Sequence, residues 1–487
     1  MRPDIIPTGI SGLDEILGDG VPRNHIYLLM GNPGTGKTTL GLQYLLEGVR
    51  RKEKALYLTF MQTVPDLEET AASHGWDLTG IVIKTFLAEA EKETSLAEQT
   101  LLPIAEIQLH DLMNNIEETV REIRPARMVF DSVDQFRLLS GDPAIFRQRL
   151  LKLLKLLVEI NVTAFFTESS VQASEFKTLV HGIIVLDMVI PPSNEIRRRL
   201  LVLKLRTTRH AGGYHCFCIR TGGLVVFPRL PQAGKALPPR GSAVKSGIES
   251  LDAMLGGGLE EGTACFIMGQ SGTGKSMLAT AYVHAMARQG ETAIIFLFEE
   301  RRDIFLKRAE GAGMDLAPLI ERNLLEIRQV NIGDWCSGEF AHNLRHAVEQ
   351  RQVRAVVIDS LTGFRRAAHE EPQLVGQLHD MLAFLGRHRV LSLVTVTSHG
   401  LTIENPDNFE ASFLSDTIIW LRRFEAMGSF RLALSVLKKR DGDHEKSIRE
   451  FRITANGATV GEPLREFRGI LSGMPVYTGK SHKLMRE

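Results

Sequence analysis

The same series of sequence signals occurs twice in this chain of 487 residues, and it occurs in the same order. Each series begins with a Gly-Ile-x-x-Leu-Asp segment, at positions 9–14 and 247–252. A glycine-rich segment, an apolar run ending in Asp-Ser and a basic segment follow in both. Because a repeated order of motifs marks repeated structural units, we predict two copies of one domain. The later segments pair as 31–38 with 269–276, 127–132 with 355–360, and 203–206 with 437–440.

A proline-rich connector separates the two copies. Residues 228–242 contain four prolines, two glycines and few apolar residues, which is typical of an exposed linker. We therefore predict a first domain at 1–230, a linker at 231–243 and a second domain at 244–487 that ends in a short C-terminal tail. Within each copy, short apolar runs such as 293–298 alternate with longer helical patterns such as 277–288. This alternation predicts an α/β fold with a mainly parallel sheet and helices on both faces.

Both glycine-rich segments match the pattern GxxxxGK[ST], follow an apolar run and precede a helical pattern, as phosphate-binding loops do. A glycine-rich turn that binds nothing is the alternative, and two complete matches in this context disfavour it. Backbone N–H groups and a helix N-terminus would face the phosphates of ATP. Lys37 and Lys275 would reach the β and γ phosphates, and Thr38 and Ser276 would bind Mg²⁺. The predicted loop contacts are Gly34, Thr35, Gly36, Lys37, Thr38, Thr39, Gly272, Thr273, Gly274, Lys275, Ser276 and Met277.

Carboxylates follow two kinds of apolar run. Asp131 and Asp359 end matching runs, where a carboxylate can hold a water of the magnesium ion; a capping aspartate before serine is the alternative. Glu299 and Glu300 follow another run in the second copy, where we predict catalysis together with Lys275. One of the two would be a general base, and Glu299 is also a candidate metal ligand. A solvated glutamate pair is the alternative.

The first copy has Met61 and Gln62 at the place of the glutamate pair. Methionine cannot take a proton, and glutamine can only orient a water molecule. We therefore predict that the first domain binds ATP better than it hydrolyses it.

Charge and composition limit the functional classes. Lysine plus arginine and aspartate plus glutamate number 58 each, so no global basic field favours nucleic acid. We see no apolar stretch of bilayer length, no secretory signal and no zinc spacing among the four cysteines, and we expect a cytoplasmic protein that contacts no membrane.

The order of motifs, the tandem domains and the segments 359–362, 438–440 and 444–451 resemble the KaiC family of RecA-like ATPases. The resemblance implies two tandem RecA-like P-loop domains, ATPase and serine/threonine autokinase activity, and a signalling or clock-like role with KaiB-like or signalling protein partners. It also implies a homohexamer with ATP at subunit interfaces. Basic residues of one subunit would then reach the γ phosphate held by its neighbour; a solvated basic strand end is the alternative. The basic candidates are Lys204, Arg206, Lys438 and Arg440, and the two segments also contain the predicted nucleotide-site residues Leu205 and Lys439.

The segment that resembles the family's phosphorylation site departs from the family pattern. Ser412 matches an acceptor serine, whereas Phe413 stands at the acceptor threonine position. Ser412 is therefore the predicted phosphorylation site, with a loop serine of no chemical role as the alternative. Two other functions remain open: an ATP-gated hexameric scaffold with little catalysis, and a RecA-superfamily DNA-dependent ATPase.

Overall fold

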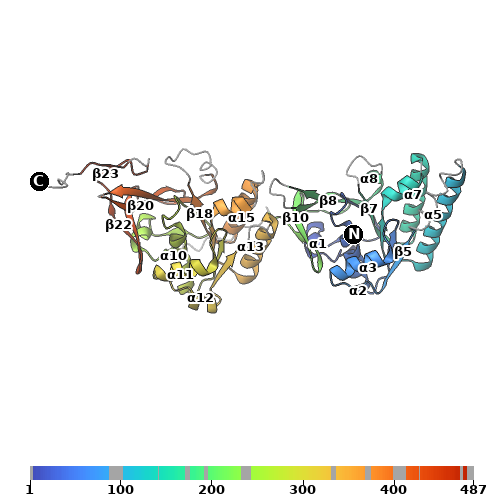
Figure 1. The fold of residues 1–487 in the computed structure, drawn as a ribbon, viewed down its shortest axis with the longest axis horizontal. Helices are drawn as coiled ribbons and strands as arrows, with labels where there is room; N and C mark the ends of the chain where they lie inside the picture. Colours follow the sequence, from blue (N-terminus) through green and yellow to red (C-terminus); the bar gives the residue numbers. More distant parts are fainter. Residues whose placement is uncertain are drawn as a thin grey trace. The chain divides into compact units, whose positions relative to one another are not determined.

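The computed structural model describes residues 4–86, 103–140, 142–169, 176–190, 196–231, 243–330, 336–367, 374–398, 413–426, 428–471 and 475–479. It divides into two compact units, Met1–Arg229 and Leu230–Glu487, whose described residues each form one nine-stranded sheet (Figure 1). The predicted acceptor Ser412 lies outside the described residues. Among the described helices, none combines the length and the apolar character needed to cross a bilayer.

The sheet of the first unit is mainly parallel. Its strands from β8 to β5 run parallel to their neighbours, and β9, β10 and β11 continue the sheet in antiparallel pairs. The order is β11 (Gly223–Phe227), β10 (Tyr214–Arg220), β9 (Arg197–Leu205), β8 (Gly182–Val189), β3 (Ile26–Met30), β7 (Thr163–Glu168), β6 (Arg127–Asp131), β4 (Ala55–Thr59) and β5 (Ile81–Thr85).

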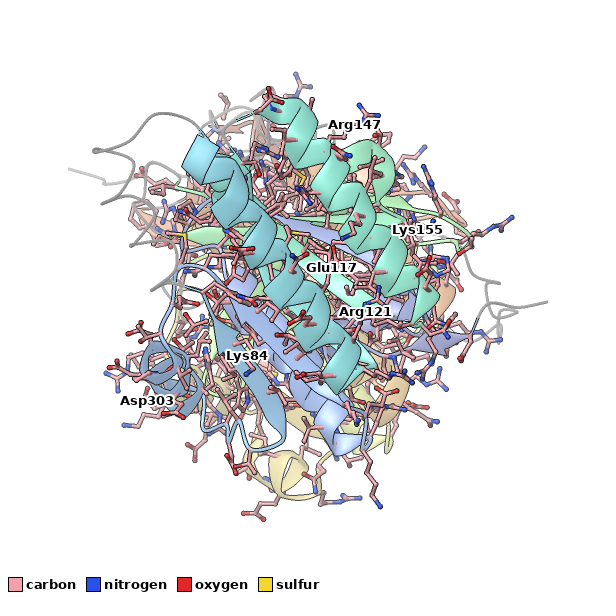
Figure 2. The ribbon with its side chains drawn as sticks, turned by 90° about the vertical axis from the view of Figure 1, so that its right-hand side faces the viewer. Lys84, Glu117, Arg121, Arg147, Lys155 and Asp303 are labelled. Atoms are coloured by element: carbon pink, nitrogen blue, oxygen red, sulfur yellow. The ribbon has the colours of Figure 1, made fainter. Side chains whose placement is uncertain are left out.

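Helices cover both faces of this sheet. Side chains alternate along β3, so Ile26, Leu28 and Met30 pack in one core and Tyr27 and Leu29 in the other. Figure 2 shows α5 and α7 side by side over one face, where Lys152 and Glu117 form an ion pair of 2.9 Å. The helices are α1 (Ser11–Leu17), α2 (Lys37–Arg50) and α3 (Val64–Ser73) on one face, and α5 (Pro103–Ile123), α6 (Val133–Ser140), α7 (Pro143–Glu159) and α8 (Phe176–Leu179) on the other.

The second unit repeats this arrangement. Its sheet is parallel from β16 to β19, and antiparallel pairs continue it. The order is β16 (Leu325–Gln329), β15 (Ala293–Leu297), β17 (Ala355–Asp359), β18 (Leu391–Thr397), β14 (Ala264–Gly269), β19 (Thr417–Ala426), β20 (Ser429–Lys439), β21 (Arg449–Thr454) and β22 (Gly457–Pro463). The predicted α/β fold is confirmed in both units.

The helices of the second unit lie in two groups, one packed into each core of the sheet. One group is α9 (Glu249–Met254), α10 (Lys275–Arg288), α11 (Arg302–Gly311) and α12 (Ala317–Glu321), and the other is α13 (Ser337–Arg351), α14 (Leu361–Ala367) and α15 (Leu374–Arg387). Short antiparallel pairs complete the described elements: β1 (Ile5–Ile6) with β2 (Val21–Pro22), β12 (Ala243–Val244) with β13 (Leu259–Glu260), and β23 (Phe467–Arg468) with β24 (Val476–Tyr477).

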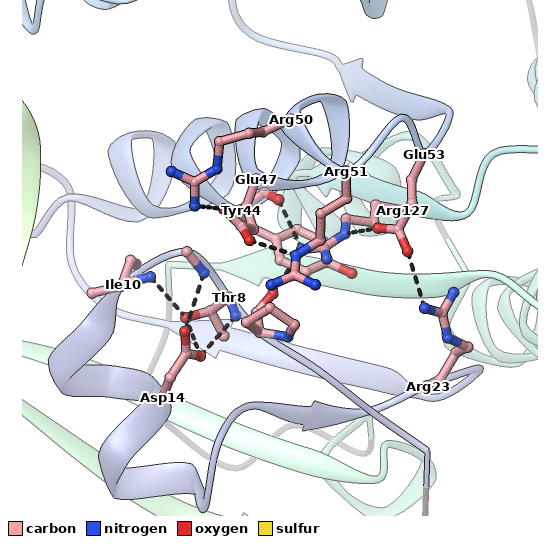
Figure 3. Close-up of polar contacts among 12 residues, drawn as sticks. Thr8, Ile10, Asp14, Arg23, Tyr44, Glu47, Arg50, Arg51, Glu53 and Arg127 are labelled. Carbon is pink, nitrogen blue, oxygen red and sulfur yellow. Dashed lines mark hydrogen bonds and ion pairs between the residues drawn. The ribbon is translucent and has the colours of Figure 1, made fainter.

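The repeated Gly-Ile-x-x-Leu-Asp segment has a structural role. Oδ1 of Asp14 accepts hydrogen bonds of 2.7 Å from both the backbone N–H and the hydroxyl of Thr8 (Figure 3). In the second unit, Oδ1 of Asp252 accepts the same two bonds from Ser246, at 2.8 and 2.7 Å. Burial raises the pKa of Asp14, and the bonds from Thr8 oppose this effect. The aspartate therefore fixes the chain segment that enters each unit.

Candidate nucleotide-binding sites

The two glycine-rich loops connect the central strand of each sheet to the following helix. The last glycine of each loop, Gly36 or Gly274, has φ of 102° or 92°, in the left-handed region that favours glycine. A Cβ atom at Gly274 would lie 2.3 Å from Cδ1 of Ile453, and one at Gly36 would lie 2.7 Å from Cδ1 of Ile219. The backbone conformation therefore favours glycine immediately before α2 and α10, whose N-termini face the loops, and a larger residue would also displace an isoleucine methyl group.

The lysine of each loop lies over its own loop. Nζ of Lys37 donates to the carbonyl oxygen of Gly31 at 2.6 Å, and Nζ of Lys275 donates to that of Gln270 at 2.7 Å. Because phosphate oxygens are stronger acceptors than these carbonyls, each ammonium group can exchange its carbonyl for a phosphate.

Burial affects the pKa of both lysines. It lowers the pKa of Lys275 to about 8, although the negative charges of Asp359 and Glu299 oppose the lowering. It also lowers the pKa of Lys37, where Asp131 and Asp134 oppose it. A desolvated ammonium group of this kind favours an anionic ligand. Each loop lysine therefore lies in the field of a strand-end aspartate and of one further carboxylate.

Hydroxyl groups hold the two strand-end aspartates. Oδ1 of Asp359 accepts a hydrogen bond of 2.5 Å from the hydroxyl of Thr395, and Thr167 makes the same contact with Asp131. The aspartate and threonine are separated by 36 positions in both copies. This repeated spacing is a sequence signal that our motif analysis missed.

Tyr57 connects the predicted magnesium ligand Thr38 with Asp131, which we predict to hold a water of that ion. Its hydroxyl donates to Oδ2 of Asp131 at 2.7 Å and also interacts with the hydroxyl of Thr38. Burial and the charge of Asp131 raise the pKa of Tyr57 well above its usual value, so the hydroxyl stays neutral. Sequence analysis did not single out Tyr57, since an aromatic residue in a buried strand has no motif.

The oxygen ligands present fit Mg²⁺ bound together with phosphates. A hydroxyl at the loop and a carboxylate at the strand end are the donors that Mg²⁺ accepts, and it commonly takes its remaining ligands from phosphates and water. Among the described residues, no three His, Cys, Asp or Glu side chains gather into a metal site of their own. A magnesium ion at these loops would thus depend on the nucleotide.

The two glutamates after β15 have different partners. Oε2 of Glu299 accepts a hydrogen bond of 2.9 Å from the hydroxyl of Ser360, and its Oε1 lies 3.4 Å from Nη1 of Arg366. Oε2 of Glu300 instead pairs with Arg308 on α11, at 2.5 Å. Burial raises the pKa of Glu300, which Arg308 opposes. Of this pair, Glu299 is the carboxylate whose negative charge raises the pKa of Lys275.

The first unit has no glutamate at this strand end. Thr59 pairs with Asp131 as Leu297 pairs with Asp359, so Met61 and Gln62 occupy the places of the two glutamates. The Met61 side chain is exposed, and its sulfur accepts a hydrogen bond from Gln135 at 3.3 Å.

The basic segments lie away from the loops of their own units. Leu205 pairs with Gly182, which pairs with Tyr27, four residues before the first loop begins at Gly31. At about 3.3 Å per residue, the end of β9 is on the order of 13 Å from the loop edge. Lys439 likewise pairs with Thr417, which pairs with Cys265 at the start of β14. The structure therefore does not bring these residues to the loop of their own unit.

Backbone carbonyls hold the basic side chains at this opposite edge. Nζ of Lys204 donates to the carbonyl oxygen of Val180 at 2.8 Å, and Nζ of Lys438 donates to that of Ser415 at 2.6 Å. Burial lowers the pKa of both lysines. Both arginines also contact backbone carbonyls: Arg206 donates to that of Thr178, and Arg440 donates to that of Phe413. Arg440 also pairs with Asp416. Lys439 donates to the carbonyl oxygen of Leu255.

Comparison with known proteins agrees with this arrangement. The family model of the KaiC ATPase matches residues 6–231 and 244–465. The circadian clock protein KaiC3 of Synechocystis sp. is 28% identical, over 98% of this chain and 95% of that protein. The circadian clock oscillator proteins KaiC of Thermostichus vulcanus and Synechococcus elongatus are 28% and 29% identical, each over 96% of this chain and 91% of that protein. Because the family model matches both repeats, this chain belongs to the KaiC family of ATPases.

Proposed function

We propose that this ATPase binds Mg²⁺ and ATP at both loops and hydrolyses ATP mainly in its second unit. The observation that carries the proposal is the convergence of Lys275, Asp359 and Glu299 at one sheet edge. Lys275 would contact the β and γ phosphates, and Ser276 with Asp359 would hold the magnesium ion or its waters. The ion would neutralise charge on the transferred phosphate.

Glu299 is the proposed general base. Its carboxylate is partly exposed and held by Ser360, so it can accept a proton from an attacking water or hydroxyl. The hydroxyl of Ser412 is the proposed acceptor for autophosphorylation. Incubation with ATP labelled at the γ phosphate, followed by site mapping, tests both reactions: released phosphate reports hydrolysis and labelled peptide reports transfer.

The proposal includes a homohexamer with ATP between subunits. The position of Lys204, Arg206, Lys438 and Arg440 at the sheet edge opposite their own loops supports it, since these groups lie away from a phosphate bound at the loop of their own unit. Light scattering with and without Mg²⁺ and ATP tests this assembly; a monomer at saturating ATP contradicts it.

A scaffold role is the second candidate, and the missing glutamates of the first unit favour it there. ATP bound at the first units of the six subunits would then hold the hexamer together. The assembled hexamer would bind KaiB-like or signalling partners in the cytoplasm. The similarity to circadian clock proteins supports a signalling or clock-like setting. Measuring hexamer stability in a hydrolysis-deficient variant separates assembly from turnover.

A further inference from the structure

The two loop lysines each lie near two carboxylates, but the second carboxylate comes from a different element in each unit. Lys275 is affected by Asp359 and Glu299, and Lys37 by Asp131 and Asp134. Asp131 and Asp359 are equivalent strand-end residues. Asp134 therefore contributes in the first unit the second negative charge that Glu299 contributes in the second, although it lies in the first turn of α6.

Hydrogen bonds hold Asp134 at the sheet edge that carries the loop. Oδ2 of Asp134 accepts a hydrogen bond of 2.6 Å from the backbone N–H of Ser169. The preceding residue, Glu168, accepts one of 3.1 Å at its carbonyl from the N–H of Gly31, the first loop residue. Two consecutive residues at the end of β7 thus connect the loop to the Asp134 carboxylate.

An ion pair between the partly exposed Arg137 and the buried Glu168 lies beside Asp134. Nη2 of Arg137 donates to Oε1 of Glu168 at 2.6 Å, and the Glu168 side chain is fully buried. Nη1 of Arg137 lies 3.8 Å from Oδ1 of Asp134, beyond hydrogen-bond distance. Oε2 of Glu168 is buried without a hydrogen-bond partner. One carboxylate oxygen at this edge therefore keeps its capacity to accept, which suits a site that receives a cation together with its phosphates.

The second unit lacks this cluster. The strand-end serines Ser132 and Ser360 are equivalent, and the residues two positions after them are Asp134 and Thr362. Thr167 and Thr395 make equivalent contacts, so Glu168 corresponds to Val396. Besides the strand-end aspartate, each unit therefore has one carboxylate whose charge acts on its loop lysine: Glu299 after β15 in the second unit and Asp134 of α6 in the first.

We propose that Asp134 is the general base of the first nucleotide site, in place of the absent glutamate. As the oxygen of water bonds to the γ phosphorus, Asp134 accepts a proton from that water. The bond from the γ phosphorus to the bridging oxygen breaks, and its electron pair leaves with ADP beside Lys37. The proton then passes to the released phosphate. The inference rests on the proposed function, because it requires ATP in the first loop.

The test uses the full chain with the second site silenced by Glu299→Gln and Glu300→Gln. Turnover that remains reports the first site, and ATP bound per chain is measured in parallel. Asp134→Asn retains an oxygen that can accept the N–H of Ser169 but cannot take a proton. We expect it to lower the remaining turnover by about 10²-fold or more, with unchanged ATP binding and melting temperature. Asp134→Glu should retain clearly more turnover than Asp134→Asn.

Asp142→Asn is the matched control. Oδ1 of Asp142 accepts hydrogen bonds of 2.6 and 3.1 Å from the backbone N–H groups of Ala144 and Ile145 at the start of α7. The side-chain oxygen of asparagine can accept the same bonds, so turnover should not change. The proposal is overturned if Asp134→Asn leaves the remaining turnover unchanged, if the silenced chain has none, or if Asp134→Glu and Asp134→Asn lose it equally. Lys37→Ala checks the proposed function separately: no loss of bound ATP would refute nucleotide binding at the first loop itself.

Discussion

The hydroxyl of Ser360 donates a 2.9 Å hydrogen bond to Oε2 of Glu299, so the residue after the end of β17 holds the carboxylate that follows β15. This contact crosses between two neighbouring strands. It distinguishes Glu299 from Glu300, which α11 holds through Arg308.

Ser360→Ala should lower ATP turnover by roughly tenfold. A hydrogen bond to a charged group contributes about 1.5 to 3 kcal/mol. Because Glu299 is partly exposed, solvent screens this bond, and we expect its contribution to lie at or slightly below about 1.5 kcal/mol. The equivalent Ser132→Ala in the first unit, where no glutamate follows the neighbouring strand, is the control. Steady-state phosphate release measures both variants, and equal effects would contradict a specific role for the Ser360 contact.

Glu299→Gln should remove most ATP turnover, by about 10²- to 10⁴-fold at the second site, because glutamine cannot accept a proton. Glu300→Gln should have a much smaller effect, since Glu300 is paired with Arg308. Phosphate release by each single variant and by the double variant checks this division. If the double variant kept nearly all its turnover while Lys37→Ala lost it, the first unit would be the main site of hydrolysis.

ATP affinity of the second site should fall as the pH rises above about 8. With the site empty, the pKa of Lys275 is about 8, so the ammonium group loses its charge above that pH. Phosphate stabilises the charged form and raises this pKa, so binding at higher pH must take up a proton. Affinity then falls by up to about tenfold per pH unit. In the variant Lys37→Ala, we expect only the second loop to bind ATP. The dissociation constant for ATP of this variant should rise between about pH 7 and about pH 9, and a constant value would contradict the lowered pKa of Lys275.

Much of the fold was predictable because each motif appears twice in the same local context. The sequence patterns of strand, glycine-rich loop and helix are short-range, so they predicted both loops and the α/β architecture. The contacts of Glu299 with Ser360 and of Asp134 with Ser169 depend on which strands are neighbours, and the sequence order does not contain that information. Tyr57 and Thr395 lie in buried strands, where polar and apolar positions can be told apart only once the register is known.

Arg440→Ala should weaken ATP-dependent assembly and turnover together. Arg440 lies at the sheet edge opposite its own loop, so we expect it to stabilise a γ phosphate held by a neighbouring subunit. Light scattering with Mg²⁺ and ATP should show a smaller particle for this variant. Arg452→Ala, which removes an exposed guanidinium paired with Glu450, is the control and should assemble normally. Normal assembly of Arg440→Ala would contradict an interfacial role.

Autophosphorylation should occur at one site, Ser412. The nearby hydroxyls of Ser415 and Thr417 are buried, at 0% and 3% exposure, so they cannot reach a γ phosphate without unfolding the start of β19. Phe413 is exposed but has no hydroxyl. Transfer requires an acceptor in line with the γ phosphate and within reach of a base, which leaves Ser412 as the acceptor of this segment.

Mass spectrometry after incubation with ATP should therefore find at most one phosphate per chain in this segment. Ser412→Ala should abolish it, and Glu299→Gln should suppress it because the acceptor hydroxyl would lack a base. Thr417→Ala is the control and should leave the phosphate in place, since that side chain is buried in β19. Phosphate chiefly on Ser415 or Thr417 would mean that the strand opens before transfer and would contradict the assignment. A chain that hydrolyses ATP and carries no phosphate would be an ATPase without kinase activity.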